Sequence, residues 1–154
     1  MKIWLACILS GLTAPIQAQT MLLTNDGKPI ARIYIPGQPS VVERQAAAVL
    51  QNYVYKISGA SLSIAKETAG IQTGPGIFIG NTAFGGKAVS SSLPGNDGFI
   101  IQSTNNNLVL RGGGSKGILY AAYTFIEKYL KCYKWDAGPA IITRTPTIII
   151  PAAV

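Results

Sequence analysis

The sequence predicts an α+β domain, close to the α/β class, in which a mixed β-sheet carries two main helices on one face. Two stretches, 40–59 and 115–130, repeat apolar residues at the spacing of an amphipathic helix. Short apolar runs bounded by Gly, Pro and Asn surround both stretches, as is typical of strands. Strands that flank helices in this order form a sheet with helices packed against it.

The first eighteen residues have the pattern of a secretion signal. Lys2 is positive, residues 3–12 are apolar, and Ala18 precedes a cleavage point that leaves Gln19 first. The apolar run is too short to span a bilayer, and no later run is long enough. We therefore expect a signal peptide at 1–18, one domain at 19–154, no membrane span, and a secreted or periplasmic location.

An opening hairpin is predicted at 21–24 and 30–35. The intervening Asn25-Asp26-Gly27-Lys28 tolerates the positive φ of a tight turn. Ser40 and Glu43 then form a capping box that starts a helix, and Gly59 suits the left-handed position that ends it. Residues 62–65 and 77–79 are expected strands, followed by a loop at 81–96.

A second hairpin is expected at 98–102 and 108–111, around Asn-rich residues 104–107. The second helix should begin at Ser115 as N-cap and bury a stripe that includes Ile118, Ala122 and Ile126. Late strands are expected at 132–135 and 147–150. Cys132, the one cysteine after the signal, lies in an apolar segment and should be a buried thiol.

Charge and composition exclude several classes of function. Without Lys2 the chain holds twelve Lys and Arg against six Asp and Glu, a net charge near +6 that is spread along the sequence. A nucleic-acid binder concentrates such charge on one element, so no nucleic-acid partner is expected. With no histidine and one cysteine left, neither a metal site nor a histidine-activated nucleophile is expected.

Residues 112–117, GGGSKG, match the G-x-G-x-x-G dinucleotide motif between a strand and a helix. Too little chain follows Asp136 to complete a cofactor crevice, so no cofactor is expected, and the glycines are explained by a tight turn and close packing. An alternative is a phosphate or sulfate held at the helix start by Gly114, Ser115 and Lys116.

Neither the carboxylates nor the aromatic residues of the sequence indicate a catalytic site. Glu127 and Asp136 are the only neighbouring acids in the second half, and each has an ordinary structural explanation, so no catalytic residue is assigned. Tyr120, Tyr123, Tyr133 and Trp135 are candidate glycan or interface contacts, because such rings stack on sugars or pack against partners.

Seven stretches, in this order and spacing, resemble the N-terminal domain of α-glucuronidase-type glycoside hydrolases, which is related to the β-hexosaminidase N-terminal domain. They are ERQAAAVLQNY (43–53), ISGA (57–60), IFIG (77–80), DGFII (97–101), LVLRG (108–112), GILYAAYTFIE (117–127) and PTIIIP (146–151). The resemblance covers nearly all of 19–154.

This resemblance implies an accessory domain that packs against a catalytic (β/α)8 barrel and does no chemistry itself, so the chain alone is not expected to be an enzyme. The barrel would be its partner, in cis or in trans, in polysaccharide degradation. The alternative is a freestanding carbohydrate-binding module for acidic glycans, in which Tyr and Trp stack on sugars while Lys or Arg pair with uronates.

Overall fold

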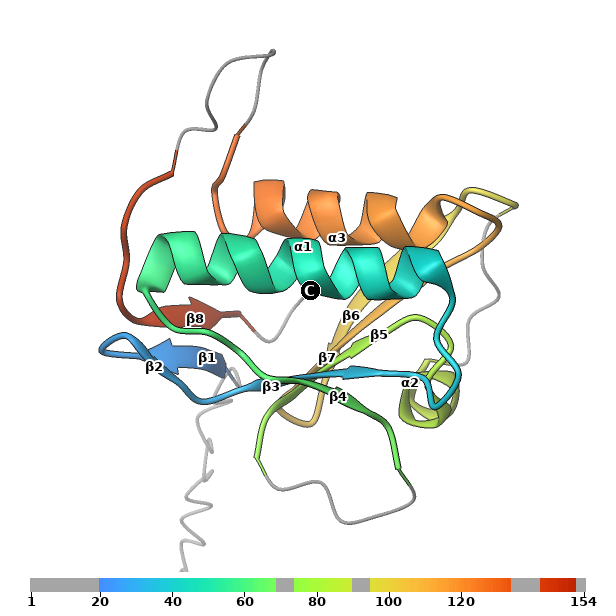
Figure 1. The fold of residues 1–154 in the computed structure, drawn as a ribbon, viewed down its shortest axis with the longest axis horizontal. Helices are drawn as coiled ribbons and strands as arrows, with labels where there is room; N and C mark the ends of the chain where they lie inside the picture. The colour runs from blue at the N-terminus through green and yellow to red at the C-terminus, as the bar shows by residue number, and fades with distance from the viewer. Residues whose placement is uncertain (1–19, 69–73, 90–94, 134–141, 152–154) are drawn as a thin grey trace, which may run out of the picture.

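The computed structural model describes residues 20–68, 74–89, 95–133 and 142–151. They form two sheets and three helices (Figure 1). The helices are α1 (Val41–Ser58), α2 (Ala83–Ala88) and α3 (Gly117–Lys128). The strands are β1 (Met21–Asn25), β2 (Lys28–Pro29), β3 (Arg32–Ile35), β4 (Ile64–Lys66), β5 (Gly76–Ile79), β6 (Phe99–Thr104), β7 (Asn107–Gly112) and β8 (Ile148–Ile150).

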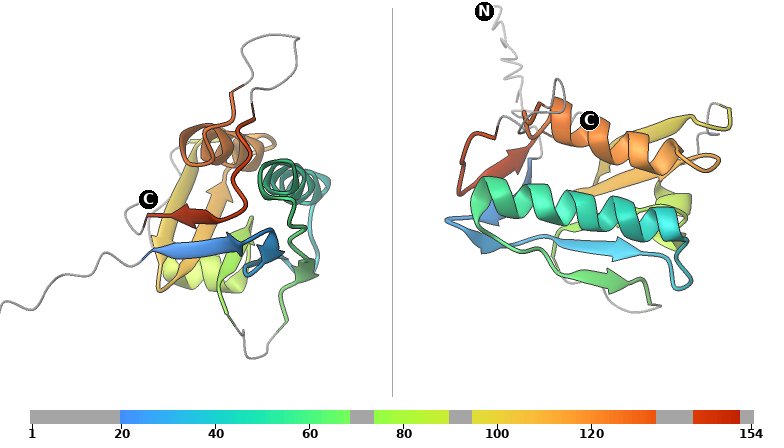
Figure 2. Two further views of the ribbon diagram at one scale, coloured as in Figure 1. Left: turned by 90° about the vertical axis from the view of Figure 1, so that its left-hand side faces the viewer. Right: turned by 45° about the horizontal axis from the view of Figure 1, so that its top comes forward.

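The main sheet has five strands in the order β4-β3-β5-β7-β6. Strands β3, β4, β5 and β7 are parallel, and β6 is antiparallel to β7. Helices α1 and α3 lie side by side over one face, whereas α2 lies on the other (Figure 2). The prediction of a mixed sheet with two main helices on one face is confirmed at this level, and the third helix is an addition.

Helix α1 forms where the sequence predicts it. The Ser40 hydroxyl accepts the Glu43 amide at 3.2 Å, and the Glu43 carboxylate accepts the Ser40 amide at 2.7 Å, which completes the capping box. Gly59 ends the helix with φ 79°, the left-handed conformation that glycine adopts without strain.

The principal core lies between α1, α3 and the main sheet. Alternate residues of the strands point into it, since side chains of a strand alternate between its two faces. The core also receives Leu50 from α1 and Phe125 from α3, both fully buried. Burying each such side chain stabilises the fold by about 1.5–3 kcal/mol. The core strand residues are Ile33, Ile35, Ile77, Ile79, Leu108 and Leu110.

The opposite face of the sheet carries a smaller core that the sequence did not indicate. Tyr34, Phe78 and Phe84 form a continuous stack with ring centroids 5.0 and 4.2 Å apart. Phe84 belongs to α2, so the expectation of a loop throughout 81–96 is wrong. Two adjacent glycines in a six-residue helix hide its helical pattern, and its stability comes from caps and this aromatic packing.

The prediction of an opening hairpin is correct for its turn and wrong for its second strand. Asp26 and Gly27 both have positive φ, as a two-residue hairpin turn requires. However, the amides of Ile30 and Ala31 both donate to the carbonyl of Leu23, so the ladder ends there. The chain then enters the main sheet as β3, while β1, paired with β2 on one side, pairs with β8 on the other to form a separate three-stranded sheet.

Three later predictions have different outcomes. The second hairpin is confirmed, with Asn105 and Asn106 in left-handed conformations at the turn. Helix α3 has Lys116 as its N-cap and no side-chain cap, so the assignment of Ser115 is wrong. Of the strand expected at 132–135, Cys132 is not in a strand and Tyr133 makes only an isolated bridge, while 134–135 lie outside the described residues. The signal peptide at 1–18 also lies outside them.

Candidate functional site

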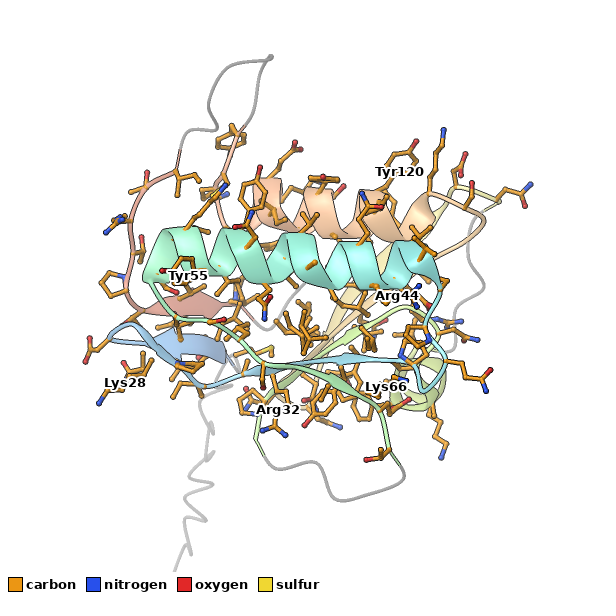
Figure 3. All side chains as sticks on the ribbon, viewed as in Figure 1. Lys28, Arg32, Arg44, Tyr55, Lys66 and Tyr120 are labelled. Atoms are coloured by element: carbon orange, nitrogen blue, oxygen red, sulfur yellow. The ribbon has the colours of Figure 1, made fainter. Side chains whose placement is uncertain are left out.

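The carboxyl edge of the parallel strands is the first candidate for a functional site, because ligands of open α/β sheets bind there. Helices α1, α2 and α3 all begin at this edge, so their amino termini point their positive dipole ends toward it. Arg44 and Lys66 lie at this end of the molecule (Figure 3). The edge is therefore electropositive unless its own acidic residues neutralise it.

Glu43 uses its carboxylate to hold this edge together. One oxygen accepts the amide and hydroxyl of Ser40, and the other accepts the amide of Asn81 at 2.8 Å. Gly80 has φ 83°, and a methyl group on it would overlap the Glu43 carboxylate. Glu43 is half-buried and serves as a structural acceptor.

Glu67 is a structural hydrogen-bond acceptor for the first turn of α2. Its two carboxylate oxygens accept the amides of Ala83 at 2.5 Å and Phe84 at 2.8 Å. The hydroxyl of Thr82 accepts a third amide, from Gly85, at 3.1 Å. Glu67 therefore satisfies the first two amides of α2, which is the role that an external anion would otherwise take, and Glu43 satisfies the N-cap amide of α1.

A small pocket remains at this edge between the ends of β5 and β7. It has a volume of about 250 Å³ and is lined by Gly80, Asn81, Arg111 and Gly112. Arg111 supplies its cation, although one of its nitrogens donates to the carbonyl of Val89 at 3.1 Å.

The glycines of the 112–117 motif are explained by close packing. A Cβ at Gly113 would lie 2.8 Å from the carbonyl oxygen of Gly95, and one at Gly117 would lie 2.6 Å from that of Gly98. At Gly114, with φ 55°, a Cβ would overlap the carbonyl of Asn96. The segment at 95–98 thus lies directly against the turn. Ser115 and Lys116 are exposed, and the anion site at Gly114, Ser115 and Lys116 stays a prediction.

The structure separates the four aromatic candidates. Tyr120 and Tyr123 lie three residues apart on α3 and point away from the sheet, with 44% and 42% of their surfaces exposed. Tyr133 is exposed beyond the end of the helix. Trp135 lies outside the described residues, as does Asp136, and Glu127 is exposed on α3.

Two pockets near the end of α1 were missed by sequence reasoning. One, of about 380 Å³, is lined by Tyr55, Lys56, Gly59, Ile142 and Arg144. The other, of about 460 Å³, includes Thr143, Thr145 and Thr147 in its lining. Both depend on contact between segments far apart in sequence. The alternation of threonines with other residues at 142–147 was the available signal.

Cys132 is buried, as expected. Its thiol lies 3.6 Å from the carbonyl of Leu130, and burial raises the pKa of this thiol. Among the described residues no three or more His, Cys, Asp or Glu side chains are grouped so that they could bind a metal. Within the same ranges, none of the helices combines the length and the apolar character needed to cross a membrane.

Comparisons with known proteins bear on the fold. No protein-family model matches the sequence, and no curated protein matches it. Among solved structures, the chain is similar to a family GH115 4-O-methyl-α-glucuronidase with specificity for decorated arabinogalactans. The identity is 18% and the TM-score 0.61, over 87% of this chain and 18% of that one. This chain therefore has the fold of one part of a much larger glycoside hydrolase.

Proposed function

We propose that this chain is an exported, non-catalytic accessory domain of an α-glucuronidase-like glycoside hydrolase. In this role it packs against a catalytic barrel and so supports the degradation of polysaccharide. The observation that carries the proposal is the fold match, in which nearly all of this chain corresponds to 18% of a glucuronidase chain. We further propose that the fold is that of the β-hexosaminidase N-terminal domain.

The acidic residues support a non-catalytic role. Glycoside hydrolysis generally uses two carboxylates on opposite sides of the scissile bond, about 5–10 Å apart. Glu43 and Glu67 accept backbone amides, which commits both to structural hydrogen bonds. Glu127 is exposed on the outer side of α3. These hydrogen bonds support a structural rather than a catalytic use of the Glu43 and Glu67 carboxylates.

Exposed apolar side chains support packing against a partner. Tyr120 and Tyr123 are exposed on α3, and Ile149 is exposed on β8. Contiguous apolar groups at a protein surface mark sites of interaction, and Tyr120 and Tyr123 are neighbours on one helix surface. We therefore propose α3 and β8 as the elements that face the catalytic domain.

The test begins with the transcript beyond codon 154 and the mass of the secreted product. Where a barrel follows in frame, we expect the full-length product to release glucuronic acid from polysaccharide. Deletion of residues 20–151 should lower its melting temperature and activity. Where the product ends there, a separate secreted glycoside hydrolase should gain thermal stability on addition of this chain.

Two results would overturn the proposal. One is hydrolysis of glucuronic acid glycosides by residues 20–151 alone. The other is a glycoside hydrolase whose activity and melting temperature are the same with and without this domain.

A further inference from the structure

The pocket beside the end of α1 has a lining that fits a charged sugar. It has a volume of about 380 Å³, within the range of about 300–1,000 Å³ that is typical of small-molecule sites. Among the residues that the structure describes, its lining consists of an aromatic residue, two cations, an aliphatic residue and a glycine, with no acidic residue. They are Tyr55, Lys56, Gly59, Ile142 and Arg144.

Backbone contacts fix this arrangement. The amide of Thr145 donates to the carbonyl of Ile57 at 2.8 Å, which holds the segment at 142–147 against the end of α1. Because side chains alternate along an extended chain, Ile142 and Arg144 line this pocket, whereas Thr143, Thr145 and Thr147 line the neighbouring one.

The carboxyl end of α1 carries the negative end of the helix dipole, which disfavours a bound anion. This effect is weaker here than at a helix end whose carbonyls have no hydrogen-bond partner. The carbonyls of its last turn already accept hydrogen bonds: Val54 from the Ser58 hydroxyl at 2.8 Å, Tyr55 from the Gly59 amide at 2.8 Å, and Ile57 from Thr145. Lys56 and Arg144, which both line the pocket, add two cationic side chains near this helix end.

Tyr55 supplies an accessible ring. With 55% of its surface exposed, it is among the most exposed large apolar side chains of the described structure. Lys56 leans toward the adjacent Tyr53, with its ammonium 5.6 Å from the centre of that ring. Tyr55 lies at the opposite end of the helical layer from Tyr120 (Figure 3), so the two rings form separate surfaces.

We propose that this pocket binds a carboxylated sugar residue. The apolar C–H face of the sugar ring packs on Tyr55 and Ile142, and the carboxylate receives charge-assisted hydrogen bonds from Arg144 and Lys56. The proposal goes beyond the accessory role, because it concerns binding by this chain and requires no catalytic partner.

The experiment is an NMR titration of the 15N-labelled mature chain at low salt with two ligands that differ only at C6. Methyl β-D-glucuronide carries a carboxylate there, and methyl β-D-glucoside carries a hydroxymethyl group. We expect the glucuronide alone to shift amide signals at 55–59 and 142–145. Arg144→Gln and Tyr55→Ala should each weaken binding about tenfold.

Matched controls are available on α3. Glu127→Gln and Lys128→Gln each remove an exposed charge from α3, so both should leave the affinity unchanged. Tyr55→Phe keeps the ring and should bind normally, which separates loss of stacking from misfolding. The proposal is wrong if the glucuronide produces no shifts, if the glucoside binds equally well, or if the α3 variants weaken binding as much as the pocket variants.

Discussion

The carboxylate of Glu43 accepts a hydrogen bond from the backbone amide of Asn81 at 2.8 Å, which ties the first turn of α1 to the chain leaving β5. The same carboxylate caps α1 through Ser40. One side chain therefore joins a local signal, the capping box, to a long-range contact across the carboxyl edge of the sheet.

Replacing Glu43 by alanine removes all of these acceptors at once. We expect Glu43→Ala to lower the free energy of unfolding by about 1–3 kcal/mol, because the amides of Ser40 and Asn81 lose their partner. Urea denaturation followed by circular dichroism measures this change. Glu127→Ala, on the exposed side of α3, should change stability by no more than about 0.5 kcal/mol. Equal effects would mean that the Glu43 contacts contribute nothing.

Gly80 and Gly86 allow a matched pair of alanine substitutions with opposite expected effects on stability. Gly80→Ala should destabilise the fold by at least about 1 kcal/mol, since φ is 83° there and a methyl group would meet Glu43. Gly86→Ala, in α2 with nothing within 4 Å of the new methyl group, should stabilise it by about 0.4–1 kcal/mol. Thermal unfolding of both variants checks the opposite signs; a shift of the same sign in both would contradict this account.

Burial of Cys132 predicts slow reaction with thiol reagents. Because desolvation raises the pKa of its thiol, the folded protein should react with a disulfide reagent at pH 8 far more slowly than the protein in denaturant. The raised pKa also stabilises the fold below the thiol pKa of the unfolded chain, about 8.5. This stabilisation should decline as pH rises through the folded value. Cys132→Ala should lose that part of the pH dependence, and fast labelling of the native thiol would exclude the buried site.

Variants of Tyr120 and Tyr123 can distinguish a role in docking from a role in folding. Both are exposed, so Tyr120→Ser and Tyr123→Ser should change the stability of the isolated domain by no more than about 0.5 kcal/mol each. In a longer enzyme, the double variant should lower the melting temperature of the whole protein. Calorimetry on both forms makes the comparison. A double variant that leaves the longer enzyme unchanged would remove α3 from the proposed interface.

The predicted anion site at Gly114, Ser115 and Lys116 is tested by phosphate. If it exists, millimolar phosphate raises the melting temperature, and Lys116→Gln reduces the gain because one cation is lost. Lys128→Gln provides the control for a general effect of charge. NAD should produce no shift beyond that of phosphate. If phosphate does not change the melting temperature of the parent chain, the anion site is excluded.

The elements that the sequence predicted correctly carry their signals locally. Ser40, Glu43 and Gly59 define both ends of α1, and Asn105 and Asn106 define a turn, without reference to any distant residue. Helix α2 was missed because one of its caps, Glu67, follows β4 and lies 16 residues before Ala83, beyond the reach of a short sequence window.

The candidate sites likewise divide into features that the local sequence indicates and features that depend on distant segments. Exposure of Tyr120 and Tyr123 follows from their place outside the apolar stripe of α3. The carbonyls that lie against the glycine turn belong to 95–98, a segment brought there by the pairing of β6 with β7. Likewise, no local pattern unites Tyr55 with Arg144, because the pocket that they share exists only after the chain has folded back.

Strand β1 pairs with β8 in antiparallel register, so Met21 lies opposite Ile150 and the two described ends of the domain emerge side by side. Tension applied between these ends would open the ladder one residue pair at a time from its margin, while the five-stranded sheet bears no direct load. The same proximity allows the ends to be joined by a short linker and new ends to be opened at an exposed turn such as Asn105-Asn106.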